Sequence, residues 1–434
     1  MSKKILIIVF IIFLGFLSGC EKEKLESGFF KEIKEIPNYD EYDETFWIGG
    51  WNDPEITLLN YQNAKAMGLN KMFVWRGKTE AQLDNLFNYA SQTGIEIIYT
   101  VEGNYLNELS EKDALLKYKD SDVLFGINVF DEPKGEKVPE LYSIGKSYDE
   151  FNSIKYVNLY PSTVGKENTG YRDYEDYARA VVENFIIKQD GLKVISQDLY
   201  PLKGTPTNPK IVPVWLQDME ILTKLSIEYD LFTHFFILTT KHYDYRRTSV
   251  ETLRYQINVF LAHGAKGLTH FTYAHDGDGR FDVAITYFDG RKTEKYEMAK
   301  TVNHELLAWD HVYLQFDIIE NMYVLGEGHS SNPCFELTKY DVETFDYIKE
   351  IYTTEDAVLG NFKDKDGNHA FMITNFADPD LKKTNYIEID LGNANMALIY
   401  INGVKKMVDL NNGILKLELK PSEGAFVIPF NLKK

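Results

Sequence analysis

Eight short apolar runs alternate with helical segments over residues 46–309, and this alternation restricts the possible folds more than any other feature. The strand-like runs cover residues 46–51, 71–75, 96–101, 124–130, 155–160, 193–199, 232–239 and 267–273. Apolar residues recur at helical spacing in the segments between them, at 56–67, 81–92, 174–186, 213–229 and 250–263. Repeated β/α units favour a parallel sheet. Eight units in roughly 265 residues match the size of a (β/α)8 TIM barrel.

An open doubly wound sheet is the other common parallel fold, and it usually carries a glycine-rich phosphate loop after its first strand. Here Gly49 and Gly50 lead into Trp51 and Asn52 instead. The sequence also lacks a P-loop and a metal-binding H-E-x-x-H motif. We therefore expect a closed barrel that has neither a cofactor nor a metal ion.

The pattern changes after Trp309. Short alternating strands are expected at 370–374, 386–390, 397–401, 414–419 and 425–429, with turn sequences such as Asn402-Gly403 and Asn412-Gly413. This pattern predicts an antiparallel β-sandwich over residues 312–434. Because we find no acid pair at a plausible binding surface in it, we interpret it as a packing module, with carbohydrate binding as a second role.

The first 19 residues are typical of a secretory signal peptide. Lys3 and Lys4 precede an apolar run over residues 5–16, and the sequence L-S-G-C ends at Cys20. This box resembles the bacterial lipoprotein signal, which implies cleavage before Cys20 and attachment of a lipid to its sulfur. The alternative is an ordinary secretory signal or an uncleaved anchor. The lipoprotein interpretation places the protein in the bacterial cell envelope, anchored in a membrane on its periplasmic or outer surface. Residues 20–42 would then be a tether, and residues 43–311 the barrel.

The chain is strongly acidic. Removal of the signal peptide takes away two lysines and no acid, so the formal charge changes from −19 to −21. Nucleic acids and anionic lipid surfaces would be repelled by this charge, so we exclude nucleic acid as a partner. The 29 tyrosines and 27 phenylalanines exceed what a core alone requires. Because aromatic faces stack on sugar rings, this surplus is consistent with a carbohydrate substrate.

Two adjacent carboxylates follow the fourth strand, in the sequence F-G-I-N-V-F-D-E-P at residues 125–133. Active sites of β/α barrels lie at the carboxyl ends of the strands, so Asp131 and Glu132 are the first catalytic candidates. Without further context, the same residues could be an N-cap and a solvated glutamate. Asp198, which follows the sixth strand, is the third catalytic candidate. Other polar and aromatic residues at strand ends are candidates for substrate binding, namely Trp51, Glu102, Asn158, Tyr160, Tyr200, Lys241 and Tyr273.

Glycoside hydrolysis requires a proton donor and a second group that attacks the sugar or activates water. Glu132 is the candidate for the proton donor. Asp131 could raise the pKa of Glu132 by repulsion or could orient it through a hydrogen bond. Adjacent residues of a strand point to opposite sides, so both carboxylates face the site only if a bulge interrupts the strand.

The barrel strand that ends in a glutamate followed by proline resembles the large clan of glycoside hydrolases with (β/α)8 barrels, whose fourth strand usually ends in Asn-Glu-Pro. Asp131 replaces the asparagine. The sequences N-L-Y-P at 158–161, S-Q-D-L-Y-P at 196–201, H-G-A-K-G-L at 263–268 and F-T-Y at 271–273 resemble glycosidase-like lipoproteins of polysaccharide-degrading bacteria. The resemblance implies a glycosidase-like barrel in which Glu132 is the acid.

The clan places its nucleophile, a glutamate, at the end of strand seven, but residues 235–240 contain no glutamate. Three alternatives follow. In the first, Glu132 acts as acid and Asp198 or Glu102 as base, with water between carboxyls about 6.5–9.5 Å apart, and the anomeric configuration is inverted. In the second, the acetamido oxygen of the substrate attacks, oriented by Asp131, as in substrate-assisted N-acetylhexosaminidases. In the third, the barrel binds glycans without catalysis. We therefore expect a glycoside hydrolase, with a non-catalytic glycan-binding lipoprotein as the alternative.

Overall fold

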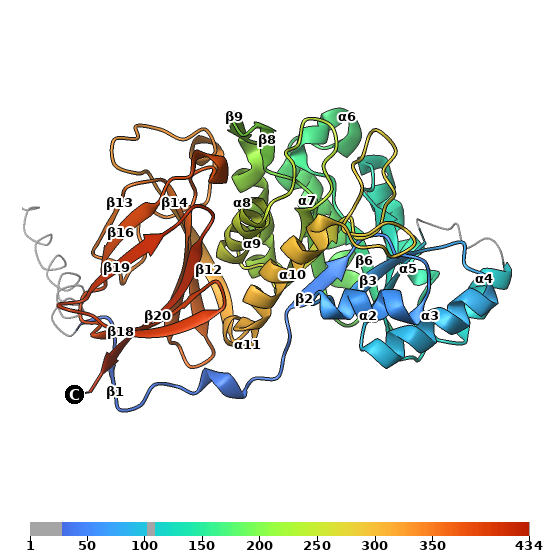
Figure 1. Cartoon of the computed structure of the whole chain (residues 1–434), viewed down its shortest axis with the longest axis horizontal. Coiled ribbons are helices and arrows are strands. Elements are labelled where there is room, and N and C mark those ends of the chain that lie inside the picture. Colours follow the sequence, from blue (N-terminus) through green and yellow to red (C-terminus); the bar gives the residue numbers. More distant parts are fainter. Residues whose placement is uncertain (1–27, 102–108, 434) are drawn as a thin grey trace, which may run out of the picture.

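The computed structural model describes residues 28–101 and 109–433, and its N-terminal part is a barrel of eight parallel strands surrounded by helices (Figure 1). The strand order is β6-β5-β4-β3-β2-β11-β10-β7. The edge strands β6 and β7 meet where Leu159 pairs with Gln197, and the Leu159 N–H donates to the Ser196 carbonyl at 2.9 Å. This bridge closes the cylinder. The barrel strands are β2 (Trp47–Gly50), β3 (Lys71–Trp75), β4 (Glu96–Thr100), β5 (Leu124–Asp131), β6 (Ile154–Asn158), β7 (Val194–Gln197), β10 (Phe232–Leu238) and β11 (Gly267–Phe271).

Helices follow the strands and cover the outside of the barrel. They are α2 (Leu58–Ala66), α3 (Glu80–Thr93), α4 (Leu109–Leu116), α5 (Leu141–Lys146), α6 (Lys166–Thr169), α7 (Tyr174–Asn184), α8 (Val214–Tyr229), α9 (Val250–Ala262), α10 (Glu294–Leu307) and α11 (Asp310–Tyr313). Local sequence fixes several of their ends. Thr79 and Gln82 form a capping box at the start of α3, and Gly94 ends that helix in the left-handed conformation, at φ +65°. A short hairpin, β8 (Leu202–Thr205) and β9 (Asn208–Ile211), precedes α8 and was not predicted.

Aromatic side chains fill the inside of the barrel. Trp47, Phe73, Tyr156 and Phe236 are at most 3% exposed, and the ring of Phe73 lies 5.3 Å from that of Tyr156 and 6.0 Å from that of Phe236. The barrel is therefore a packed core and not a channel. Polar groups of the strands that a ligand could reach are therefore expected at the carboxyl end of the barrel.

The C-terminal part consists of two antiparallel sheets that share one apolar core. The larger sheet contains β12 (Phe316–Val324), β14 (Ala357–Asp364), β15 (His369–Asn375), β20 (Gly424–Leu432), β17 (Met396–Ile401) and β18 (Val404–Asp409), in that order. The smaller one contains β13 (Glu350–Thr353), β16 (Asn385–Asp390) and β19 (Ile414–Leu419). Asn402 and Gly403 turn the chain between β17 and β18 with φ of +47° and +80°, as a tight hairpin requires. The predicted fold class, a (β/α)8 barrel followed by an antiparallel β-sandwich, is confirmed.

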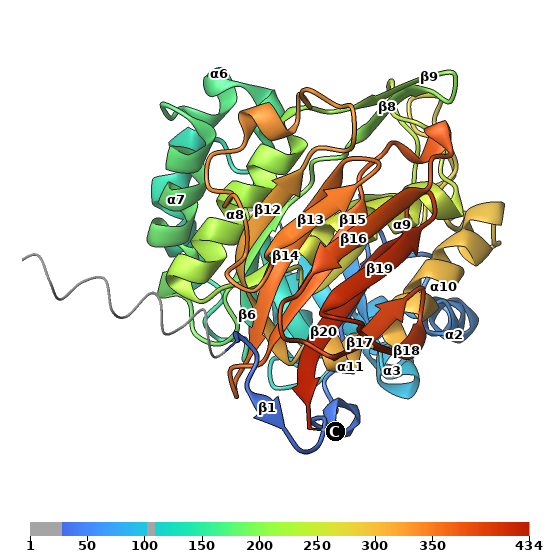
Figure 2. The same cartoon turned by 90° about the vertical axis from the view of Figure 1, so that its left-hand side faces the viewer.

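The larger sheet lies against the barrel helices α8 and α9, which stand behind it in Figure 2. Trp309 stacks between the two parts, with its ring 5.7 Å from that of Tyr400 and 5.5 Å from that of Phe426. Gly360 of β14 approaches α9 so closely that a Cβ atom there would lie 2.1 Å from the Ala262 carbonyl oxygen. Core residues of the barrel helices and of this sheet form one continuous cluster.

The chain before the barrel runs along the C-terminal part (Figure 1). Strand β1 (Glu32–Ile33) pairs in parallel with the end of β20, and Tyr39 is buried, with its hydroxyl donating to Asp364 at 3.0 Å. The predicted signal peptide and Cys20 lie outside the described residues. The boundaries at residues 19, 42 and 311 stay predictions. In the part of the chain that the structure describes, we find no helix with the length and hydropathy needed to cross a bilayer.

A buried arginine joins the loop after β10 to the C-terminal domain. Arg246 is 5% exposed, and its guanidinium donates to Asp378 at 2.7 Å and to Asp380 at 2.7 Å. It also reaches the Lys210 carbonyl at 3.3 Å. Three acceptors therefore surround the two terminal nitrogens of this planar cation, while its buried Nε has no hydrogen-bond partner within the described residues.

Removal of this arginine should strongly destabilise the protein. Arg246→Met leaves Asp378 and Asp380 without their cation in a buried place, so we expect the free energy of unfolding to fall by about 3–5 kcal/mol. Arg291→Met removes an arginine that pairs with Asp289 at the exposed surface, where the expected loss is about 0–1 kcal/mol. Urea denaturation followed by circular dichroism measures both. Equal losses in the two variants would contradict a structural role for the buried pair.

Candidate active site

Three carboxyl groups meet at the carboxyl end of the barrel, on β5 and just after β7. Strand β5 has a register shift between Asn128 and Phe130. This is the kind of bulge that would allow both adjacent carboxylates to face the site. Glu132 leaves the strand with φ +52°, and its N–H donates to the Asn158 carbonyl at 2.9 Å. A left-handed conformation is unfavourable for a glutamate by roughly 1–2 kcal/mol. The charge of Asp131 acts on the Glu132 carboxyl, which indicates that the two carboxyls lie close together.

Asn158 lies at the centre of the cluster. Its side-chain Nδ2 donates to Asp198 Oδ1 at 3.0 Å and to Asp131 Oδ1 at 3.3 Å. Asn158 is 2% exposed, whereas all three acids are partly exposed. The buried amide therefore binds two carboxylates, and each of these carboxylates keeps part of its surface exposed to solvent.

The acidic cluster retains a proton near neutral pH. Burial, followed by repulsion from Asp131, raises the pKa of Glu132 to about 7, although a hydrogen bond with Asp198 opposes the rise. Burial and the charges of Glu132 and Asp131 also raise the pKa of Asp198 well above its usual range. Three carboxylates cannot all ionise at such close quarters, so one of them stays protonated.

Besides Asn158, two of the predicted binding residues, Tyr160 and Tyr200, lie beside these acids. The charges of Glu132, Asp131 and Asp198 add to burial in raising the pKa of Tyr160. They act in the same direction on Tyr200, whose pKa burial raises well above its usual range. Tyr200 is 4% exposed, and its hydroxyl has no hydrogen-bond partner within the described part of the chain. Its ring packs edge-on against His242, at 5.9 Å.

The structure does not place the other predicted residues beside the acids, or they lie outside the described residues. Trp51 is buried inside the barrel, where its ring lies 5.0 Å from that of Phe73. Tyr273 is 1% exposed and belongs to the separate core between strands and helices, so the structure does not bring it to the acids. Lys241 lies in the loop after β10, partly exposed, and its carbonyl accepts a hydrogen bond from the Asp282 N–H. Glu102 and Cys20 lie outside the described residues.

A buried polar network below the cluster was not predicted. It contains Tyr156, Ser196, His234 and Thr269, which are completely buried inside the barrel. The sequence carried a signal for Tyr156 and Ser196. Tyr156 precedes Asn158 by two residues, and Ser196 precedes Asp198 by two, so each should face the same side of the sheet as its partner. Over residues 28–101 and 109–433, the acids and histidines form no group of three that is arranged to hold a metal ion.

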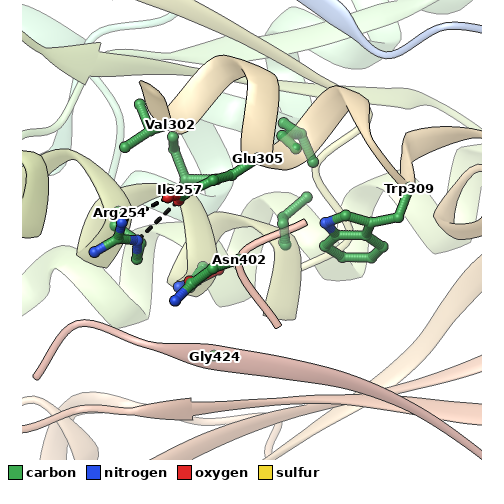
Figure 3. Close-up of a pocket in the computed structure, with 10 residues that line it drawn as sticks. Arg254, Ile257, Val302, Glu305, Trp309, Asn402 and Gly424 are labelled. Carbon is green, nitrogen blue, oxygen red and sulfur yellow. Dashed lines mark hydrogen bonds and ion pairs between the residues drawn. The ribbon is translucent and has the colours of Figure 1, made fainter. Parts of the chain in front are cut away.

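A small cavity lies away from the acids, between α9, α10 and the C-terminal sheets (Figure 3). It is bordered by the ion pair of Arg254 and Glu305, by Trp309 and by Asn402. Its volume of about 20 Å³ has room for little more than one water molecule. This cavity is too small for a sugar ring, and we assign it to the contact between the domains.

Replacement of Glu132 should stabilise the protein at neutral pH. Because the pKa of this partly buried acid is raised from 4.5 to about 7, its contribution to the free energy of unfolding falls as the pH rises between these values. Glu132→Gln removes the penalty, so the variant should gain stability over wild type by roughly 1–3 kcal/mol above pH 7 and by little near pH 4. Thermal unfolding across this range measures the difference. The exposed Glu136→Gln is the control, and the same pH trend in both variants would refute the interpretation.

Comparison with known proteins finds similar structures but no similar sequences among families or curated proteins. No protein-family model and no curated protein matches the sequence. The chain is similar to a family 27 β-L-arabinopyranosidase from Geobacillus stearothermophilus, with a TM-score of 0.49 and 12% identity over 91% of this chain and 99% of the other. An α-amylase from Anoxybacillus matches with a TM-score of 0.40 and 10% identity over 91% and 99%. A family 128 endo-β-1,3-glucanase from Sorangium cellulosum matches with 0.37 and 10% over 58% and 97%. These neighbours are glycoside hydrolases, and what each hydrolyses is a property of that protein.

Proposed function

We propose that this protein is a glycoside hydrolase in which Glu132 is the general acid. The observation that carries the proposal is the acidic cluster at the carboxyl end of the barrel, where Glu132 keeps a proton up to about pH 7 beside two further carboxyls. A glycosidic oxygen needs such a donor when its bond breaks. The partly exposed position of Glu132 makes this proton accessible to a bound substrate.

The contact between the acids favours the substrate-assisted mechanism over inversion with Asp198 as base, and Glu102, the other candidate base, lies outside the described residues. Inversion with Asp198 as base needs a water molecule between carboxyls about 6.5–9.5 Å apart. Asp198 instead lies close enough to lower the pKa of Glu132 through a hydrogen bond, which is a shorter separation than an inverting pair has. Asp131 accepts a hydrogen bond from the same Asn158 nitrogen, which lies 3.3 Å from its Oδ1. In this mechanism Asp131 orients the acetamido group of the substrate, and the acetamido oxygen attacks the anomeric carbon as Glu132 protonates the leaving oxygen.

The proposal extends to the location of the protein. A lipid on Cys20 would hold the barrel at the bacterial envelope, where oligosaccharides or polysaccharides reach it. The non-catalytic alternative, a glycan-binding lipoprotein, remains an outcome of the activity test because β10 is followed by Thr239 and Thr240, without the glutamate of the large clan.

Activity should depend on Glu132 and on the substituent at carbon 2 of the sugar. We expect the mature chain to hydrolyse aryl 2-acetamido-2-deoxyglycosides and not the matched glycosides with a 2-hydroxyl. Glu132→Gln should lower kcat by roughly 10²–10⁴-fold, because a general acid contributes that much. Initial rates on a panel of both sugar classes measure this. Glu136→Gln is the matched control, and unchanged kcat in Glu132→Gln would refute the assigned role. Binding of glycans without any product would establish the alternative.

The pH dependence of kcat/KM should depend on Asp131, which is the neighbour of the general acid Glu132. Because Glu132 must carry its proton, kcat/KM should fall as the pH rises through about 7. Asp131 raises the pKa of Glu132 by repulsion, so Asp131→Asn should move this alkaline limb to lower pH while it also lowers the rate. An alkaline limb that stays in place, or moves to higher pH, would contradict the coupling between the two residues.

A further inference from the structure

A line of buried hydrogen bonds connects Asn158 to the far side of the barrel interior. The Ser196 hydroxyl donates to Asn158 Oδ1 at 2.9 Å. Ser196 Oγ also lies 2.9 Å from His234 Nδ1, and His234 Nε2 lies 2.9 Å from the Thr269 hydroxyl. The Tyr156 hydroxyl contacts both Ser196 Oγ and His234 Nδ1, the latter at 3.2 Å. These groups come from four neighbouring positions around the barrel, on β6, β7, β10 and β11.

The direction of each hydrogen bond in this line is determined by its chemistry. Asn158 must present its NH2 group to the carboxylates, so its oxygen faces Ser196 and only accepts. Ser196 has one hydrogen, which this oxygen takes, and the contact with His234 Nδ1 is therefore favourable only if Nδ1 carries the hydrogen. His234 is neutral, since burial lowers its pKa to about 3. Its Nε2 is then an acceptor, which Thr269 satisfies with its hydroxyl.

The line therefore ends in two N–H bonds that point at Asp131 and Asp198, whereas Glu132 receives none from Asn158. A hydrogen bond from an amide stabilises the ionised form of a carboxyl group. We propose that Thr269, His234 and Ser196 act as positioning residues that fix the orientation of Asn158 and thereby keep the shared proton of the acidic cluster on Glu132. This proposal rests on the proposed function only for its catalytic consequence.

Other titratable groups around the acids do not supply this selection. Outside the cluster, the titratable side chains on which Glu132 or Asp198 acts are tyrosines from several elements: Tyr156, Tyr160, Tyr174, Tyr177, Tyr200 and Tyr245. Burial raises the pKa of each of them, so they are neutral near pH 7. Asn158 is the neutral side chain that donates to Asp131 and Asp198 and not to Glu132. Loss of its fixed orientation would let Asp198 take the proton.

Infrared spectroscopy of the full mature chain without substrate tests the proposal. The band of a protonated carboxyl at pH 7 should disappear in Glu132→Gln and persist in Asp198→Asn. In a Ser196→Ala background this order should reverse, with the band now lost on Asp198→Asn. An unchanged assignment in that background would overturn the proposal. The readout needs no sugar, so its failure is distinct from a failure to find hydrolysis.

A second set of variants guards against loss of folding in Ser196→Ala. Thr269→Val keeps the volume and removes the hydroxyl that holds the His234 tautomer, and Thr269→Ser restores a hydroxyl. We expect the alkaline limb of kcat/KM, and the carboxyl titration seen by infrared, to move to lower pH by about half a unit or more in Thr269→Val. Thr269→Ser should return it. Thr353→Val is the matched control, because it removes a buried hydroxyl on β13 that has no hydrogen-bond partner within the described residues, so it should leave the titration in place. Equal shifts in Thr353→Val and Thr269→Val would overturn the directed line.

Discussion

The pairing of β6 with β7 is the constraint on which the candidate site depends. These strands are the two edges of the parallel sheet, and their meeting at Leu159 and Gln197 turns the sheet into a closed cylinder. The same meeting brings Asn158 within 3.0 Å of Asp198, which is 40 residues further along the chain. In an open sheet these two residues would lie at opposite margins. Closure of the barrel and assembly of the acidic cluster are therefore one event.

Much of the fold could be predicted because its elements have strong periodic patterns. All eight barrel strands were found within a few residues. Strands of the C-terminal domain were missed where the pattern is broken. A bulge interrupts the alternation of β12 between Ile318 and Glu320, and the edge strand β18 carries mostly exposed residues. Local spacing could not have identified such segments.

The site was predictable in its residue types but not in its connections. Asp131, Glu132 and Asp198 were selected because they follow barrel strands, and the structure brings them together. Tyr273 was selected for the same reason but faces the helices, since one position along a strand decides which side a residue faces. Glu132 leaves its strand in a left-handed conformation that no spacing rule reveals. The hydrogen-bond line through His234 requires knowledge of which strands are neighbours.

The close approach of Gly360 to Ala262 has a consequence for the evolution of this architecture. Backbone meets backbone there, so neither α9 nor β14 can change its path without the other. A recombination event that brought in a foreign C-terminal domain would have to supply a matching helix to the barrel as well. The two domains should therefore be inherited as a pair, even though each has the outline of a common module.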